Sequence, residues 1–254
     1  MLNVRSTVLV ILASTPVFNT VLADDTSVPP APDAPLPALH AVPGGDTPGR
    51  ILDSSGREVL LRGVNVNTHV EYWQYDPNRF TTYPFTEDDA DRVASMGWNM
   101  VRLCVSWSRI EPEPGQYDDS YLDAVAVTVA RLRERGIYTL IDLHQDAWGP
   151  SLFAPPDEVC PDSKPAGGWD GAPAWATFDD GRPRCNARAR ELVPAVRAAW
   201  ENFFKDREGP GGVGIRTRYV RMFAYVVKRF ATDNAVAGYD VMNEPNQFLE
   251  ENAP

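Results

Sequence analysis

The segment YDVMNEPN, residues 239–246, carries an acidic side chain out of an apolar, strand-like run that then stops at Pro245. A carboxylic acid at such a strand end, partly buried so that it keeps its proton, can donate that proton to a leaving oxygen. Glu244 is therefore the candidate general acid. The alternative is that Asn-Glu-Pro only marks the turn after a strand.

Other polar residues lie at or near the ends of further strand-like segments. Arg102 lies within NMVRLCVSW, and His144 and Asp146 end IYTLIDLHQD. Arginine, histidine, aspartate and asparagine can hold sugar hydroxyls, and a tryptophan face can stack on the apolar side of a pyranose ring. The residues expected to share one sugar site are Arg102, His144, Asp146, Trp148, Trp175, Asn243 and Glu244.

Each of these residues also has a purely structural alternative. Arg102 could pair with a core carboxylate, and His144 could be a satisfied core histidine. Asp146 and Asn243 could be turn or cap residues. Three tryptophans could simply pack the long loop that follows residue 145, namely Trp148, Trp169 and Trp175.

A retaining glycosidase also needs a nucleophilic carboxylate about 5–5.5 Å from its acid. No good candidate stands among the strand ends of this sequence. Three further acids, Glu111, Glu113 and Glu158, lie in Pro-rich loops and are expected to be solvated. The nucleophile is therefore expected outside these 254 residues.

Strands and helices in alternation must position these side chains. Strands that are apolar on both faces and alternate with helices form a parallel sheet whose carboxyl ends share one side. The solutions are a doubly wound sheet and a (β/α)8 TIM barrel. No glycine-rich phosphate loop follows the first strand, which argues against the nucleotide-binding version. Strands are predicted over 61–66, 99–107, 137–144 and 236–243, helices from Thr86 to Gly97 and over 120–135, 194–204 and 215–230, and a hairpin in ILDSSGREVLL.

The chain of 254 residues has room for about the first four βα units of such a barrel. Residues 1–23 have the pattern of a secretory signal peptide cleaved after Ala23, with a membrane anchor as the alternative. Residues 24–50 are predicted to be a Pro-rich linker, and 51–254 the N-terminal half of a catalytic domain. The protein is thus expected to be secreted.

Composition and cysteine content limit the partners. The net charge of −11, without a basic patch, argues against nucleic acid as a partner. Export would permit a disulfide, and Cys160 and Cys185 could staple the long polar loop, whereas Cys104 is expected to be a buried free thiol. No CxxC or HxxxH spacing occurs, so no metal site is expected.

Several segments together resemble glycoside hydrolase family 5, the cellulase-like (β/α)8 barrels, and in particular its endoglycoceramidases and endoglycosylceramidases. The resemblance runs from about residue 51 to 246 and is carried by LRGVNVN, MGWNMVRLCVSWSRIEPEPGQYD, RGIYTLIDLHQDAWG, GAPAWAT and AVAGYDVMNEP. It implies that Glu244 is the acid/base and that Asn243 contacts the sugar 2-hydroxyl. It also implies that the nucleophile lies on a seventh strand, beyond Pro254.

The remaining residues take roles from the same resemblance. Arg102 would hold the nucleophile in place, and His144 and Asp146 would bind hydroxyls of the sugar next to the scissile bond. Trp175 would form a wall of that subsite. The implied reaction cleaves the β-linkage between an oligosaccharide and ceramide, with retention and without a cofactor.

Three functions remain open from the sequence. The first is a secreted retaining glycosidase that acts on glycolipids and makes peripheral contact with a lipid surface. The second is a β-glucanase or β-glucosidase of the same family. The third, from another class, is a non-catalytic half-barrel that binds carbohydrate. In each case this chain alone is expected to be inactive, and the sequence leaves its oligomeric state open.

Overall fold

A computed structural model of the chain describes residues 35–45, 48–71 and 82–246. Its centre is a sheet of four parallel strands, β3 (Gly63–His69), β4 (Met100–Ser106), β5 (Tyr138–His144) and β8 (Val236–Asp240), each paired with the next in chain order. A doubly wound sheet would cross back after its second or third strand and add the next strand beside its first, whereas a barrel adds each strand beside the last. The predicted fold of about four (β/α) barrel units is confirmed.

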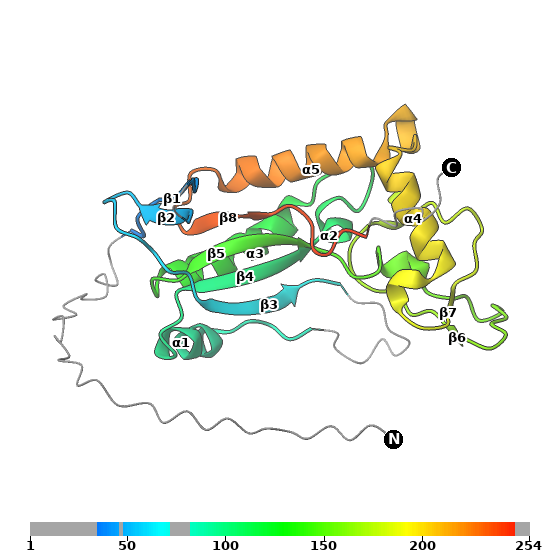
Figure 1. Cartoon of the computed structure of the whole chain (residues 1–254), viewed down its shortest axis with the longest axis horizontal. Helices are drawn as coiled ribbons and strands as arrows, with labels where there is room; N and C mark the ends of the chain where they lie inside the picture. The colour runs from blue at the N-terminus through cyan, green and yellow to red at the C-terminus, as the bar shows by residue number, and fades with distance from the viewer. Residues whose placement is uncertain (1–34, 46–47, 72–81, 247–254) are drawn as a thin grey trace, which may run out of the picture.

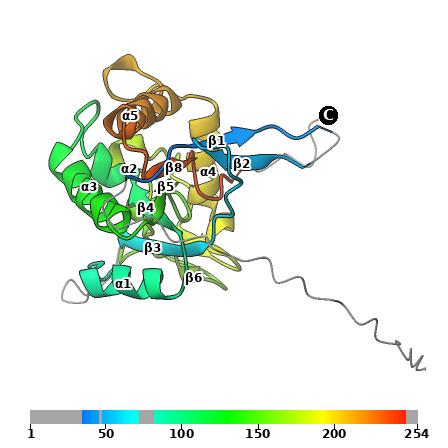
Figure 2. The ribbon, with the colours of Figure 1, turned by 90° about the vertical axis from the view of Figure 1, so that its left-hand side faces the viewer.

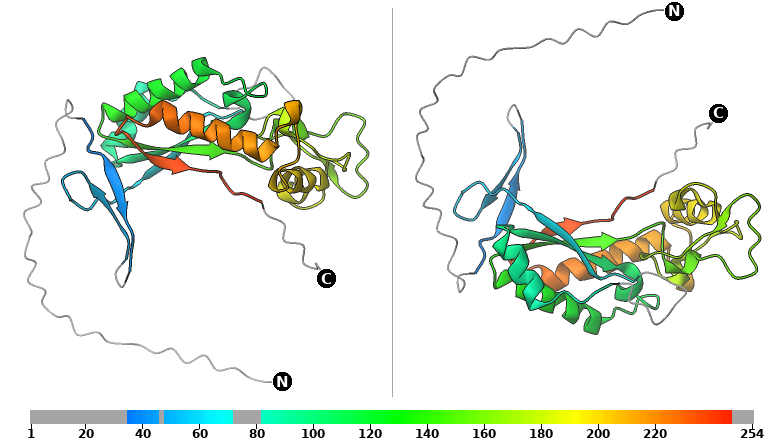
Figure 3. Two further views of the ribbon diagram at one scale, coloured as in Figure 1. Left: turned by 90° about the horizontal axis from the view of Figure 1, so that it is seen from above. Right: turned by 90° about the horizontal axis from the view of Figure 1, so that it is seen from below.

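Three helices cover the convex face of this sheet, α1 (Glu87–Ser95), α3 (Asp119–Arg133) and α5 (Ile215–Phe230) (Figures 1 and 2). The opposite, concave face carries no helix among the described residues, as the views along the other axis show (Figure 3). The short α2 (Trp107–Ile110) follows β4, and α4 (Pro194–Phe204) lies beyond the carboxyl ends of the strands.

Strand alternation separates the two faces chemically. In β4, Val101, Leu103 and Val105 are at most 1% exposed and belong to the hydrophobic core that the helices cover. Because successive side chains of a strand point to opposite faces, Arg102 and Cys104 point to the concave face. The neighbouring strands continue this polar face, because Cys104 pairs in register with Asp142 of β5 and Asp142 pairs with Asp240 of β8.

The helix ends follow the predicted signals. Thr86 caps α1 with a reciprocal capping box to Asp89. Gly97 and Gly136 follow the ends of α1 and α3 with φ values of 69° and 70°. These left-handed conformations suit glycine, which has no Cβ to clash with the preceding carbonyl.

The linker prediction for residues 24–50 is wrong where those residues are described. Strand β1 (Leu39–Val42) pairs antiparallel with β2 (Arg50–Asp53), and Leu36 is buried. Tyr138 anchors this segment, because its hydroxyl donates to the Pro37 carbonyl at 2.8 Å. The four residues Leu-His-Ala-Val form a strand within a Pro-rich composition. The predicted signal peptide, residues 1–23, lies outside the described residues.

The predicted hairpin of ILDSSGREVLL is present as a tight turn. Leu52 and Glu58 form an antiparallel bridge, and Asp53 accepts from the backbone of Ser55 and Arg57. Strand β2 nevertheless takes its main partner, β1, from the preceding segment.

The long segment between β5 and α4 is irregular and is held by a disulfide. Cys160 and Cys185 are bonded, with their Cα atoms 5.5 Å apart, as predicted, and Cys104 is a buried free thiol. Among the described residues no helix is long and apolar enough to cross a membrane. The short elements are η1 (Pro150–Leu152), β6 (Lys164–Pro165), η2 (Ala174–Ala176), β7 (Cys185–Asn186), η3 (Arg190–Leu192) and, after α4, η4 (Pro210–Gly212).

Candidate active site

Arg102 links β4 to β8 on the concave face. Its Nη2 donates to Asp240 Oδ2 at 2.6 Å and to Asn243 Oδ1 at 2.9 Å. It also lies 3.0 Å from Asp142 Oδ1, as an ion pair without hydrogen-bond geometry. Burial disfavours the charge, but Asp240 and Asp142 outweigh it and raise the pKa of Arg102. Arg102 therefore does pair with core carboxylates, and its predicted hold on a nucleophile stays a prediction.

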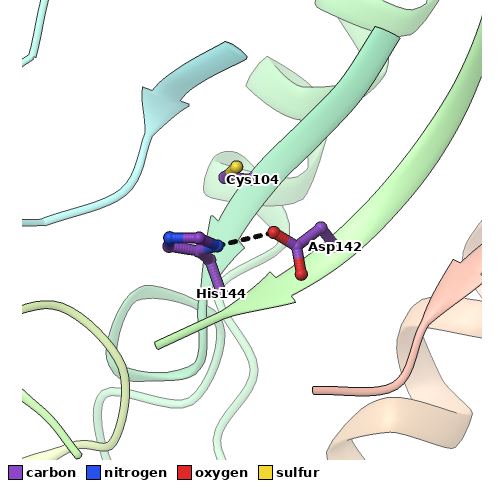
Figure 4. A group of neighbouring side chains, drawn as sticks. All are labelled: Cys104, Asp142 and His144. Carbon is purple, nitrogen blue, oxygen red and sulfur yellow. Dashed lines mark hydrogen bonds and ion pairs between the residues drawn. The ribbon is translucent and has the colours of Figure 1, made fainter. Parts of the chain in front are cut away.

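His144, at the end of β5, faces Asp142 from the same strand, with the Cys104 thiol beside them (Figure 4). Its Nδ1 lies 2.6 Å from Asp142 Oδ2, and Nε2 lies 3.7 Å from Asp146 Oδ2. Burial favours the neutral ring, but the hydrogen bond to Asp142 and the contacts with Asp146 and Cys104 prevail and raise the pKa of His144 to about 12. His144 is therefore an imidazolium at neutral pH. Burial raises the pKa of Cys104, which stays a thiol.

Asp146 is held from its other side by Arg190 of η3. The Arg190 Nη2 donates to Asp146 Oδ1, and its guanidinium lies 4.6 Å over the ring of Trp169. The side chains of His144 and Asp146 remain 14% and 12% exposed. Both side chains therefore remain partly accessible, as binding to sugar hydroxyls requires.

The tip of β8 is clamped to the tip of β5. Gln145 Nε2 donates to the carbonyl oxygens of Asn243 and Glu244 at 2.6 and 3.0 Å, and Asn243 Nδ2 donates back to the Gln145 carbonyl at 3.0 Å. These bonds hold Glu244 at φ 41°, a left-handed value that is uncommon for a residue with a Cβ. Asn243 keeps one amide hydrogen and one lone pair for a ligand.

Glu244 is exposed among the described residues, so its expected partial burial is wrong for this part of the chain. Its carboxylate does lie close enough to Arg190 to contribute to the raised pKa of that guanidinium, although burial of Arg190 is the largest influence and acts in the opposite direction. The structure thus brings Glu244, Asp146 and His144 to one rim at the carboxyl ends of β5 and β8.

The GAPAW segment packs directly on the tip of β5. The Asp146 amide donates to the Asp170 carbonyl at 3.0 Å, and the Ala172 amide donates to the Trp148 carbonyl at 2.7 Å. Gly171 has φ 131°, and a Cβ there would lie 2.3 Å from the Trp148 carbonyl oxygen. Only glycine allows this approach, which brings Asp170 beside the site.

Trp148 is not in the rim. It is 2% exposed and packs against Trp107, Trp200 and Phe203, while its Nε1 donates to Thr177. Its predicted stacking on a sugar is wrong for this arrangement, because neither face is free. Side chains of α2 and α4 cover residue 148, a long-range effect that spacing cannot show.

Trp175 also packs inward, although it is only half-buried. Its Nε1 donates to the Glu111 carbonyl at 3.0 Å, and its ring meets Trp107 edge-on. Its role as a subsite wall remains a prediction that no contact in this structure supports. Trp169, which lies under Arg190, is the tryptophan beside the polar rim.

Glu111 was expected to be solvated, and this is wrong. It is fully buried and accepts from Trp107 Nε1 at 2.9 Å and from the Gly115 amide at 2.7 Å. Burial is the main cause that raises the pKa of Glu111. Its side-chain hydrogen bonds are with α2 and the turn after it rather than with the rim, so it supports the fold. Glu113 is exposed and Glu158 is half-buried.

Five residues of the site escaped the sequence analysis. Asp142 lies two positions before His144, so strand alternation alone puts both on one face, and Asp240 could have been found in the same way. The others are placed by tertiary contacts for which no periodic signal exists. They are Gln145, Asp170 and Arg190.

The chain matches known glycosidases. The family model for cellulase (glycosyl hydrolase family 5) matches residues 52–252. Endoglycoceramidase I of Rhodococcus hoagii is 28% identical over 200 residues, 77% of this chain and 35% of the relative. A glucosylceramidase of Rhizopus delemar is 33% identical over 149 residues, 50% of this chain and 20% of the relative.

Solved structures that are similar to this chain carry names of the same kind as these relatives. A crystal structure of an endogalactoceramidase superposes with a TM-score of 0.77 at 39% identity and covers 83% of this chain and 45% of the other. Endo-glycoceramidase II from Rhodococcus sp., in a cellobiose-like isofagomine complex, gives a TM-score of 0.60 at 36% identity over 77% of this chain and 42% of the other. The chain therefore spans less than half the length of these relatives.

Proposed function

The chain belongs to glycosyl hydrolase family 5, and from this premise we propose that it carries the acid/base half of a site that hydrolyses a β-glycosidic bond in a glycolipid. Glu244 protonates the leaving oxygen. The substrate class is supported by the names of similar proteins, which include endoglycoceramidase, glucosylceramidase and ergosteryl-beta-glucosidase. In each name the sugar belongs to a lipid.

The observation that carries this proposal is the clamp at the strand tips. Gln145 and Asn243 fix the backbone that bears Glu244, and Arg102 fixes Asn243. A general acid must be held within hydrogen-bond reach of the oxygen that it protonates. His144 and Asp146 lie at the same rim and bind hydroxyls of the sugar.

The mechanism that we propose is retaining, with a nucleophile that is not among the described residues. The carboxylates of Asp142 and Asp240 are engaged by Arg102, and Asp142 is fully buried. Carboxylates held in ion pairs with Arg102 are not free to approach an anomeric carbon. We therefore also propose that this chain alone does not hydrolyse a glycoside.

Secretion is part of the proposal. The Cys160–Cys185 disulfide supports it, because disulfides persist in oxidising compartments and are rare in the cytosol. The pattern of residues 1–23 supports it independently.

A β-glucanase activity is the second candidate, since Cellulase/esterase CelE of Acetivibrio thermocellus also matches, at 27% identity over 113 residues. The test compares two substrates, a fluorescent glucosylceramide and a cello-oligosaccharide. The chain is assayed alone and as a chimera in which residues 35–246 replace the equivalent half of endo-glycoceramidase II.

We expect no turnover by the chain alone, and turnover of the glucosylceramide in preference to the cello-oligosaccharide by the chimera. Preference for the cello-oligosaccharide would favour the β-glucanase. Turnover by the chain alone that Glu244→Gln abolishes would overturn the proposed absence of a nucleophile.

A further inference from the structure

Asp170 is a buried carboxyl group with no role in the proposed reaction. It is 0% exposed, and neither Oδ1 nor Oδ2 has a hydrogen-bond donor among the described residues. An ionised carboxylate without partners in such a place is strongly disfavoured. Asp170 must therefore hold a proton or have a cation beside it.

Its neighbours are residues of the proposed sugar site. One oxygen of Asp170, one oxygen of Asp146 and a ring nitrogen of His144 all lie within 4.8 Å of one another. Tyr121 of α3 is near enough for the charge of Asp170 to contribute to the raised pKa of its hydroxyl, of which burial is the largest cause. Arg190 neutralises Asp146 from the opposite side. The hydrogen bond from the Asp146 amide to the Asp170 carbonyl holds the two residues side by side.

We propose that Asp170 is a positioning residue that keeps its proton at neutral pH and donates it in a hydrogen bond to the carboxylate of Asp146. Asp146 thereby stays ionised and oriented as an acceptor for a sugar hydroxyl. The role of Asp146 as an acceptor for a sugar hydroxyl rests on the proposed function, whereas the protonation of Asp170 is a property of the folded chain alone.

The titration of the two carboxyl groups agrees with one shared proton. Burial is the main cause that raises the pKa of Asp170 to about 7; the charge of His144 opposes this shift and the charge of Asp146 adds to it. Burial acts in the same direction on Asp146, but the contacts with His144 and Asp170 and the charge of Arg190 outweigh it and lower the pKa of Asp146. Opposite shifts in adjacent carboxyl groups are typical of a pair that shares a proton.

A divalent cation is the rival occupant, because His144, Asp146 and Asp170 offer suitable ligand atoms. The charges argue against it. His144 already carries a positive charge that Asp142 stabilises, and the Arg190 guanidinium already neutralises Asp146. A dication would have to sit beside both of these groups, whereas a proton satisfies Asp170 without adding a repulsive neighbour.

The shared proton has a consequence for binding. When Asp170 ionises, two carboxylates face each other at close range, and their repulsion should turn Asp146 away from its acceptor geometry. Affinity for a glycoside should then fall as the pH rises through neutrality. Asp170→Asn would keep a donor to Asp146 and lose the charge, whereas Asp170→Ala would lose the donor.

Infrared difference spectroscopy of the 254-residue chain, between about pH 5.5 and about pH 8.5, tests the proton directly. We expect the carbonyl band of a protonated carboxylic acid at the lower pH and its loss at the higher pH. The band should be absent in Asp170→Asn and retained in Asp162→Asn, which changes an exposed aspartate of the same segment. A band of equal intensity in Asp170→Asn and the parent chain, or no band in the parent chain, would overturn the proposal.

Two further measurements complete the test. Binding of a soluble β-glucoside should be pH-independent in Asp170→Asn and about tenfold weaker in Asp170→Ala. Added Ca²⁺, Mn²⁺ or Zn²⁺ should not raise the Tm, and a rise that Asp170→Asn abolishes would establish the cation instead. If no variant binds the glucoside, the proposed function fails, while the infrared result still decides whether Asp170 holds the proton.

Discussion

Charges of alternating sign run along the rim, and this alternation fixes each side chain. Arg102, Asp142, His144, Asp146 and Arg190 follow one another through contacts of at most 3.7 Å. Each interior member lies between two groups of opposite charge, so its rotamer is determined from both sides. A site of this kind is preorganised, because its polar groups need not reorient when a sugar arrives.

His144 gives the first prediction. Its folded-state pKa of about 12 lies above the ordinary value of 6.5, so its contribution to stability is complete below pH 6.5 and is lost as the pH rises towards 12. His144→Gln should cost about 3 kcal/mol at neutral pH, because it leaves a buried charge less compensated. Denaturant unfolding should show the difference between the two chains shrinking above pH 6.5, and a difference that is constant with pH would contradict the assignment.

Glu244 gives the second prediction at the residue scale. In the chimera described above, Glu244→Gln should lower kcat for a glucosylceramide by about 1000-fold, because the leaving oxygen loses its proton donor. KM should change little. Glu113→Gln, which alters an exposed acid of a neighbouring loop, is the control and should leave kcat unchanged. Equal losses in the two variants would mean that Glu244 is not the acid.

At the scale of elements, the sequence predicts most of the helices and strands that position the site. Strand and helix patterns locate β4, β5, α4 and α5 to within a few residues, because their apolar periodicity is strong. The rim residues carried by those strands, Arg102 and His144, were found for the same reason. Asp170 and Arg190 were not, since the loop that carries them is placed by packing on β5. The prediction for Trp148 was wrong for a similar reason, because helices α2 and α4 cover this side chain only in the folded chain.

Gly171 gives the element-scale prediction. Gly171→Ala should destabilise the chain by about 3 kcal/mol, since the new Cβ meets the Trp148 carbonyl oxygen and φ is unfavourable for alanine. Gly167→Ala is the matched control in the same loop, because a Cβ at that position has nothing within 4 Å. Urea unfolding should separate the two variants, and equal stabilities would mean that the loop does not need this close approach.

At the scale of the whole molecule, the described sheet is open. Strands β3 and β8 each have a partner on one side only among the described residues, and the concave face is covered by no helix. A groove of about 670 Å³ runs beside β8 and α5, and Leu140, Tyr239 and Val241 contribute to its lining. Unpaired edges and exposed apolar surface favour association.

The chain expressed alone should therefore self-associate. Sedimentation at increasing protein concentration should show dimers or larger species, and a charged substitution at an exposed edge position, Val241→Lys, should reduce them. A monomer at every concentration would contradict the prediction and would mean that another segment of the chain covers the open sheet.

The tips of β5 and β8 together form one sugar site, on which the proposed function depends above all. Calorimetric titration of the chain with a soluble β-glucoside measures this directly, with His144→Ala and Asp146→Ala as the site variants and Asp162→Ala as the exposed control. We expect each site variant to bind about tenfold or more weakly and the control to bind as the parent chain does. Affinity that is the same in the parent chain and in both site variants would contradict the account.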